Sequence, residues 1–69
     1  MDPDKRNMAR AIRLLTSCTT SESVSMARAA QRALAALANG YEKAFRNECR
    51  AVMLHSQSMA LCAALAKVV

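Results

Sequence analysis

The residues that could support catalysis are few, and they do not cluster. The one histidine, His55, is followed by Ser56 and Ser58. The five acids of the chain all precede it: Asp2, Asp4, Glu22, Glu42 and Glu48. A nucleophile needs a base that takes its proton and a further group that orients the base, and neighbouring residues of a helix point in different directions. We therefore predict that the protein is not an enzyme and that His55 is a polar helix-surface or interface residue.

The three cysteines, Cys18, Cys49 and Cys62, have no spacing typical of a disulfide framework or a metal site. Their odd number and the absence of a Cys-x-x-Cys pair favour three reduced thiols that pack as small apolar groups. A zinc site shared between two chains through His55 and Cys62 stays open as an alternative, because these residues share a helix face. The single glycine excludes a phosphate-binding loop. We expect no metal, no cofactor and a reducing, cytoplasmic location.

The charge of the chain indicates an anionic partner without identifying it. Ten basic and five acidic residues give a net charge of +5, and seven of the basic residues are arginine. This balance is compatible with nucleic acid, an anionic membrane or an acidic protein surface, and arginine pairs with carboxylates as readily as with phosphates. The simplest alternative is a solvated helix face. We predict five residues as anchors of a partner-binding surface: Arg28, Arg32, Tyr41, Arg46 and Arg50.

The composition predicts an all-α fold. Fifteen alanines and five methionines stand against one glycine and one proline, so helix formers dominate and residues typical of turns are scarce. A length of 69 residues allows one domain, 1–69. Apolar and basic side chains recur on opposite faces at helical spacing. The pattern predicts three helices at about residues 3–16, 20–38 and 41–68, the second and third forming an antiparallel hairpin.

Local signals set these boundaries. The first helix is expected to start with Asp2 as its N-cap and Pro3 at its first position. The sequence Thr19-x-x-Glu22 fits a capping box at the start of the second helix. Asn39-Gly40 predicts the break between the second and third helices, and Asn39-x-x-Glu42 predicts the start of the third.

The third predicted helix becomes apolar on nearly all sides after His55. Four residues occupy the side that is basic in its first half, and we predict them as a dimer interface: Leu54, Leu61, Leu65 and Val68. A helix of this kind must be covered on both sides, and a second copy of the chain is the simplest cover for the outer one. The apolar run 59–66 is far shorter than the roughly 20 residues that span a bilayer. The start of the chain also lacks the pattern of a signal peptide, so we expect no membrane partner.

A small, basic, dimeric DNA-binding regulator is the second function class. With Gly40 as the turn glycine of a helix-turn-helix, Ala36 falls where a small residue is required. Arg46, however, falls where the recognition helix should bury an apolar residue, and the apolar second half of that helix is unsuited to contact with base edges. Affinity for duplex DNA that falls steeply with salt would favour this class.

Two resemblances add to these expectations. In its length, its helix pattern and segments such as Arg28-Ala29-Ala30-Gln31-Arg32 and Asn39-Gly40-Tyr41, the chain resembles small helical early proteins of temperate Pseudomonas phages, in particular those directed against quorum sensing. This resemblance implies a dimeric, phage-encoded inhibitor that blocks a host regulator by contact alone. The implied targets are a LuxR-type transcription activator and a pilus assembly ATPase. The chain also resembles helical-hairpin chaperones of type III secretion.

Overall fold

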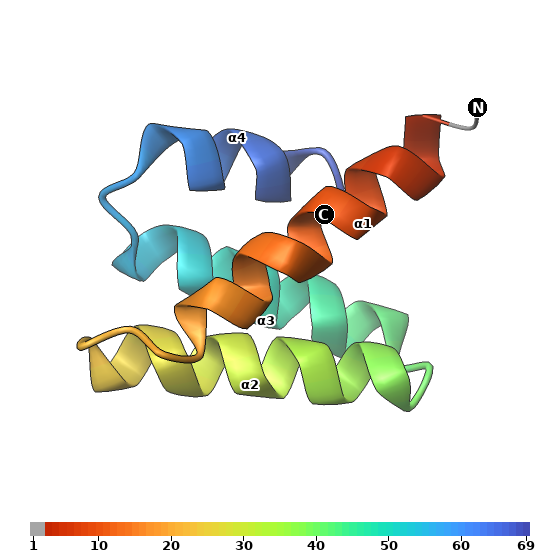
Figure 1. Cartoon of the computed structure of the whole chain (residues 1–69). Helices are drawn as coiled ribbons and strands as arrows, with labels where there is room; N and C mark the ends of the chain where they lie inside the picture. Colours follow the sequence, from red (N-terminus) through yellow and green to blue (C-terminus); the bar gives the residue numbers. More distant parts are fainter. Residues whose placement is uncertain (1–2) are drawn as a thin grey trace.

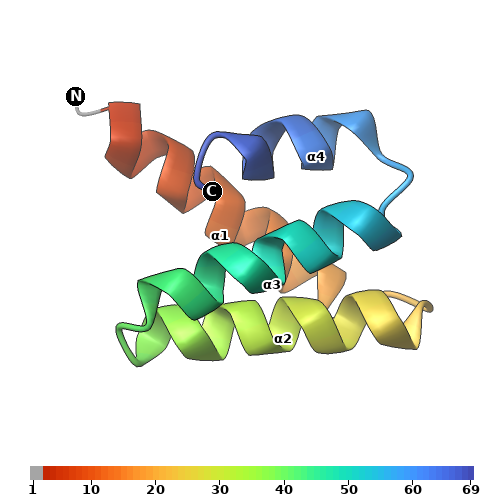
Figure 2. The ribbon, with the colours of Figure 1, turned by 180° about the vertical axis from the view of Figure 1, so that it is seen from behind.

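The computed structural model describes residues 3–69, which form four α-helices and no strand. The helices are α1 (Pro3–Cys18), α2 (Val24–Ala38), α3 (Glu42–His55) and α4 (Met59–Ala66). Helices α2 and α3 run antiparallel side by side, α4 lies on the other side of α3, and α1 crosses this row diagonally (Figure 1). The view from behind shows the same order (Figure 2). The all-α prediction is confirmed, but the expected third helix is two helices.

The core depends on a seam of alanines along α2. Four alanines of this helix are buried: Ala29, Ala30, Ala33 and Ala36. Because these side chains are small, the axes of the neighbouring helices can approach closely. The largest fully buried side chains come from the other helices: Leu15, Cys49, Val52 and Leu65. Among the described residues no polar or charged side chain is buried, so the interior holds the helices together by apolar packing alone.

The connection between α1 and α2 differs from the prediction because the hydroxyls of Thr16 and Thr19 form hydrogen bonds with carbonyl oxygens of α1. Thr16 and Thr19 donate hydrogen bonds through Oγ1 to the carbonyl oxygens of Ile12 and Thr16, at 2.8 and 2.6 Å, and α1 continues to Cys18. The predicted capping box from Thr19 is wrong. The N-cap of α2 is Ser23, whose Oγ accepts a hydrogen bond from the Met26 amide at 3.4 Å. The proposed cap Asp2 lies outside the described residues.

The predicted break at Asn39-Gly40 is confirmed, and its geometry is a Schellman motif. The amides of Gly40 and Tyr41 donate to the carbonyl oxygens of Leu37 and Ala36, at 3.1 and 2.8 Å. Gly40 has φ +78°, which is the left-handed region. The Asn39 side chain donates to the Ala35 carbonyl at 2.8 Å and so closes α2 instead of starting α3. The N-cap of α3 is Tyr41, without a side-chain hydrogen bond.

Gly40→Ala is expected to lower the free energy of unfolding by about 1 kcal/mol, because an L residue is strained at positive φ. Space is not the reason, since a Cβ at this position would meet no atom within 4 Å. Gly40→Asn should lose less, because asparagine tolerates this conformation. Denaturant titration of the three proteins checks the order. Equal stability of wild type and Gly40→Ala would mean that the left-handed turn does not form in solution.

A serine corner of Ser56, Gln57 and Ser58 separates α3 from α4. The Ser58 amide donates to Ser56 Oγ at 3.0 Å, and Ser58 Oγ accepts from the Leu61 amide at 3.3 Å. The same two bonds occur before α2: the Ser23 amide donates to Ser21 Oγ, and Ser23 Oγ accepts from the Met26 amide. A repeated Ser-x-Ser motif therefore starts both helices, with the first serine fixing the turn and the second capping the helix.

The serine corner changes which of the predicted interface residues are exposed. Because the chain turns here, α4 folds back onto α1 and α3, and Leu61 and Leu65 are buried within the core of the same chain. Burial of such side chains stabilises the fold by about 1.5–3 kcal/mol each. Of the predicted interface residues, Val68 packs half-buried against the core and only Leu54 remains largely exposed. Association of two chains stays a prediction. None of the four described helices combines the length and apolarity needed to cross a membrane.

Replacing Ser56, Gln57 and Ser58 together by alanine is expected to join α3 and α4 into one helix, because alanine removes both hydroxyl bonds and is the strongest helix former. Leu61 and Leu65 would then leave the core and be buried against a second chain. Sedimentation should show stronger association than in wild type. The matched control, Ser21→Ala with Ser23→Ala, disturbs the same motif without releasing α4 and should not associate more. A triple variant no more associated than wild type would refute this account of the corner.

Candidate protein-binding surface

The side chains that could take part in catalysis either form hydrogen bonds that shape the fold or lie exposed at the surface. His55 is the exposed last residue of α3, and the hydroxyls of Ser56 and Ser58 form the serine corner. Within residues 3–69 no group of three or more His, Cys, Asp or Glu side chains is placed to hold a metal ion. In the described part of the chain, His55 and the hydroxyls of Ser56 and Ser58 therefore lie in the α3–α4 connection and its flank.

The thiols are packing groups of unequal exposure. Cys49 is fully buried in α3, and its pKa is raised to about 11, first by burial and then by the negative charge of Glu48. Burial also raises the pKa of the Cys18 thiol. Cys62 is half-buried and donates a weak hydrogen bond from Sγ to the Met53 carbonyl oxygen at 3.6 Å. At neutral pH the buried thiols are protonated and unreactive.

The stability of the fold should decrease as the pH rises from about 9 to 11, in part because of Cys49. Its thiol ionises near 9 in the unfolded chain and near 11 in the folded one, so the unfolded state loses its proton first and is favoured. Denaturant titrations across this range should show a smaller decline for Cys49→Ala than for wild type, whatever the offset in stability. Parallel curves for the two proteins would contradict the raised pKa.

The predicted basic anchors do not form one surface. Arg32 Nε donates to Glu48 Oε2 at 3.0 Å, in a largely exposed ion pair worth at most about 1 kcal/mol. Arg28 lies one turn before Arg32 on α2. Because an α-helix turns about 100° per residue, Arg50 lies about 200° around α3 from Glu48. The pair Arg28 and Arg32 therefore borders the α2–α3 side of the molecule, whereas Arg50 faces the side toward α4.

The two other predicted anchors lie elsewhere again. Arg46 lines a hollow with Phe45 and Val68, near the end of the described chain. Tyr41 is 65% exposed at the α2–α3 turn. Arg46 borders the apolar side chains of its hollow, and Arg50 borders a second apolar surface, lined by Met53, Leu54, Cys62 and Val69.

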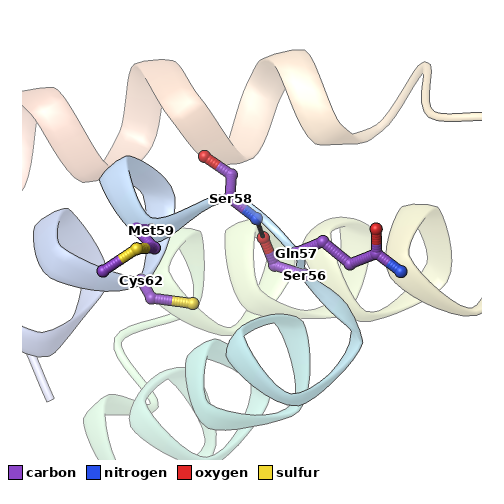
Figure 3. A pocket seen from close by; sticks show the side chains of 5 residues that line it. All are labelled: Ser56, Gln57, Ser58, Met59 and Cys62. Atoms are coloured by element: carbon purple, nitrogen blue, oxygen red, sulfur yellow. Dashed lines mark hydrogen bonds between the residues drawn. The ribbon is translucent and has the colours of Figure 1, made fainter.

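That surface lies where α3 turns into α4. Leu54 and Met59 are each 86% exposed, the highest values for large apolar side chains in the described chain. They border two hollows that share Cys62, one of about 520 Å³ at the end of α3 and one of about 210 Å³ over the serine corner. Figure 3 shows the smaller hollow, with Met59 and Cys62 projecting from the first turn of α4 and Gln57 extending away from both. The corner patch comprises the apolar residues of both hollows: Met53, Leu54, Met59, Cys62 and Val69.

The corner patch continues onto the outer face of α4. This helix reads Met-Ala-Leu-Cys-Ala-Ala-Leu-Ala and carries no polar side chain. One face, with Leu61, Ala64 and Leu65, is buried, while Ala63 and Ala66 are exposed in line with Met59. A helix without a polar face is covered on both sides in a stable arrangement, and the described chain covers one.

A second surface is basic. Arg6, Arg10 and Arg13 recur along the exposed face of α1 and surround a hollow of about 660 Å³ with Leu14 and Ser17. The spacing of these arginines was evident in the sequence, and all the residues that line the hollow belong to α1. This surface suits an extended anionic partner.

The chain was compared with protein-family models, curated proteins and solved structures, and none of them matches it. The sequence missed the corner patch because a continuous helix was expected there. The repeated Ser-x-Ser motif, at Ser21 and Ser23 and again at Ser56 and Ser58, is the signal that would have located it.

Proposed function

We propose that the chain is a small, non-catalytic protein-binding protein that acts through the corner patch. The observation that carries this proposal is the exposure of Leu54 and Met59, at 86% each, on either side of the half-buried Cys62. Adjoining exposed apolar side chains mark surfaces that bind other proteins. Met53 and Met59 adapt their shape to a partner more readily than branched side chains do.

The proposed mechanism is steric inhibition. A protein bound through the corner patch loses access to its own ligand or subunit, and no bond is made or broken. The resemblance to phage proteins directed against quorum sensing supplies the candidate targets, a LuxR-type transcription activator and a pilus assembly ATPase in a host cytoplasm. Two chains acting as a homodimer are compatible with this mechanism, and the proposal does not depend on them.

Nucleic-acid binding is the second candidate, supported by the arginines of α1. Arg10 and Arg13 border an open hollow on a chain of net charge +5. Under this alternative, duplex DNA would bind with an affinity that falls steeply with salt, and Arg10→Glu with Arg13→Glu would abolish that binding. The same pair of substitutions leaves the corner patch unchanged, so the two functions can be separated.

The proposed function predicts that protein capture depends on the corner patch. Immobilised wild type and the double variant Leu54→Ser with Met59→Gln are exposed to a Pseudomonas lysate, and retained proteins are quantified. Because both side chains are exposed, the variant should unfold at the same temperature as wild type yet lose its partner, including any LuxR-type activator. Val24→Ser is the matched control, since Val24 is 61% exposed at the start of α2, outside the patch. Equal retention by all three proteins, or none by any, would refute the function.

A further inference from the structure

We infer that the corner patch accommodates an amphipathic helix of a partner protein, and that acidic residues flank the apolar seam of that helix. The inference rests on the proposed function and specifies the chemistry of the partner. Two properties of the patch lead to it: the shape of the surface between α3 and α4, and the sign of the charges at its border.

The shape suits a helix. The larger hollow, about 520 Å³, lies between the last turn of α3 and Cys62 of α4. Beside it the outer face of α4 presents Ala63 and Ala66, and small side chains let a second helix axis approach closely. An amphipathic helix commonly binds in this way, by laying its apolar face into a hydrophobic groove. Exposed Leu54 and Met59 then pack on its two sides.

The border of the patch is basic. Arg50 lines the larger hollow, and Lys67 is exposed as the C-cap of α4. No Asp or Glu side chain lines either hollow. The described acids of α3 are elsewhere: Glu48 is paired with Arg32, and Glu42 lines a different hollow together with Arg46. A partner helix that carries Asp or Glu beside its apolar seam therefore meets opposite charges on arrival.

The same border disfavours a second copy of the chain as the occupant. A twofold interface brings identical surfaces together, so two corner patches would oppose Arg50 and Lys67 with the same residues and with no Asp or Glu side chain of either hollow to pair them. Each chain also carries a net charge of +5, and like charges across an interface suppress the wrong partner. The charge pattern thus favours a different, acidic chain.

The test is a selection from a display library of amphipathic helices that share one apolar seam and have randomised flanking positions. The full chain is the bait. Wild type should enrich Asp and Glu at the flanking positions, and Arg50→Glu should shift the enrichment toward Lys and Arg. For a selected acidic helix, Arg50→Glu and the double variant Leu54→Ser with Met59→Gln should each weaken binding on the order of tenfold or more, while Val24→Ser should not.

Each result decides the inference. Selected helices without acidic flanks, flanks that do not respond to Arg50→Glu, or no selected helix at all would overturn it. Sedimentation that shows wild-type dimers lost in the double variant would overturn it as well, because a second copy would then cover the patch. In all these cases the proposed function survives if proteins of a lysate are still retained through Leu54 and Met59, so the failures of the two proposals are distinguishable.

Discussion

The constraint on which the rest of the structure depends is that α4 has no polar face while the described residues bury only one of its sides. Leu61 and Leu65 reach the core because Ser56 and Ser58 turn the chain back on itself with two hydrogen bonds. The opposite side, with Met59 and Ala63, is left at the surface. Because α4 consists only of apolar residues, it contributes to the core on one side and leaves an exposed apolar surface on the other.

The core of the described chain is thin and its side chains are apolar. The alanine seam of α2 brings α1 and α3 close, and few large side chains are needed to fill the remaining space. No polar or charged side chain is buried among the described residues. The buried thiols conform to this, since burial raises the pKa of Cys49 and holds it in its protonated form. The surface, in contrast, differs from one side to another, with an apolar corner patch and a basic face on α1.

The sequence predicted the features that depend on strong local preferences and missed those that depend on competition between weak ones. Alanine and arginine at helical spacing predicted the helices, and the one glycine predicted the turn at Gly40. The serine corner contains neither glycine nor proline, so the apolar pattern from Phe45 to Val68 looked continuous. The Thr19 hydroxyl was expected to cap α2, but it donates its hydrogen bond to the Thr16 carbonyl oxygen of α1. The five predicted anchors are exposed, but Arg32 and Arg50, which were assigned to one surface, lie on different sides of α3.

The basic border of the corner patch has two consequences: it opposes the association of two copies, and it attracts an acidic partner. An exposed apolar patch favours self-association at about 25 cal/mol per Å² of buried surface, which threatens the solubility of any small protein. Arg50 and Lys67 oppose the meeting of two such patches, because like charges about 4 Å apart repel by about 1 kcal/mol even in water. The same two charges attract an acidic chain by a similar amount. The difference between a copy of the chain and an acidic partner is therefore set by charge, while apolar burial, which is common to both, provides the affinity. Salt reduces this discrimination before it reduces the affinity, because it screens the charges and leaves the apolar contacts in place.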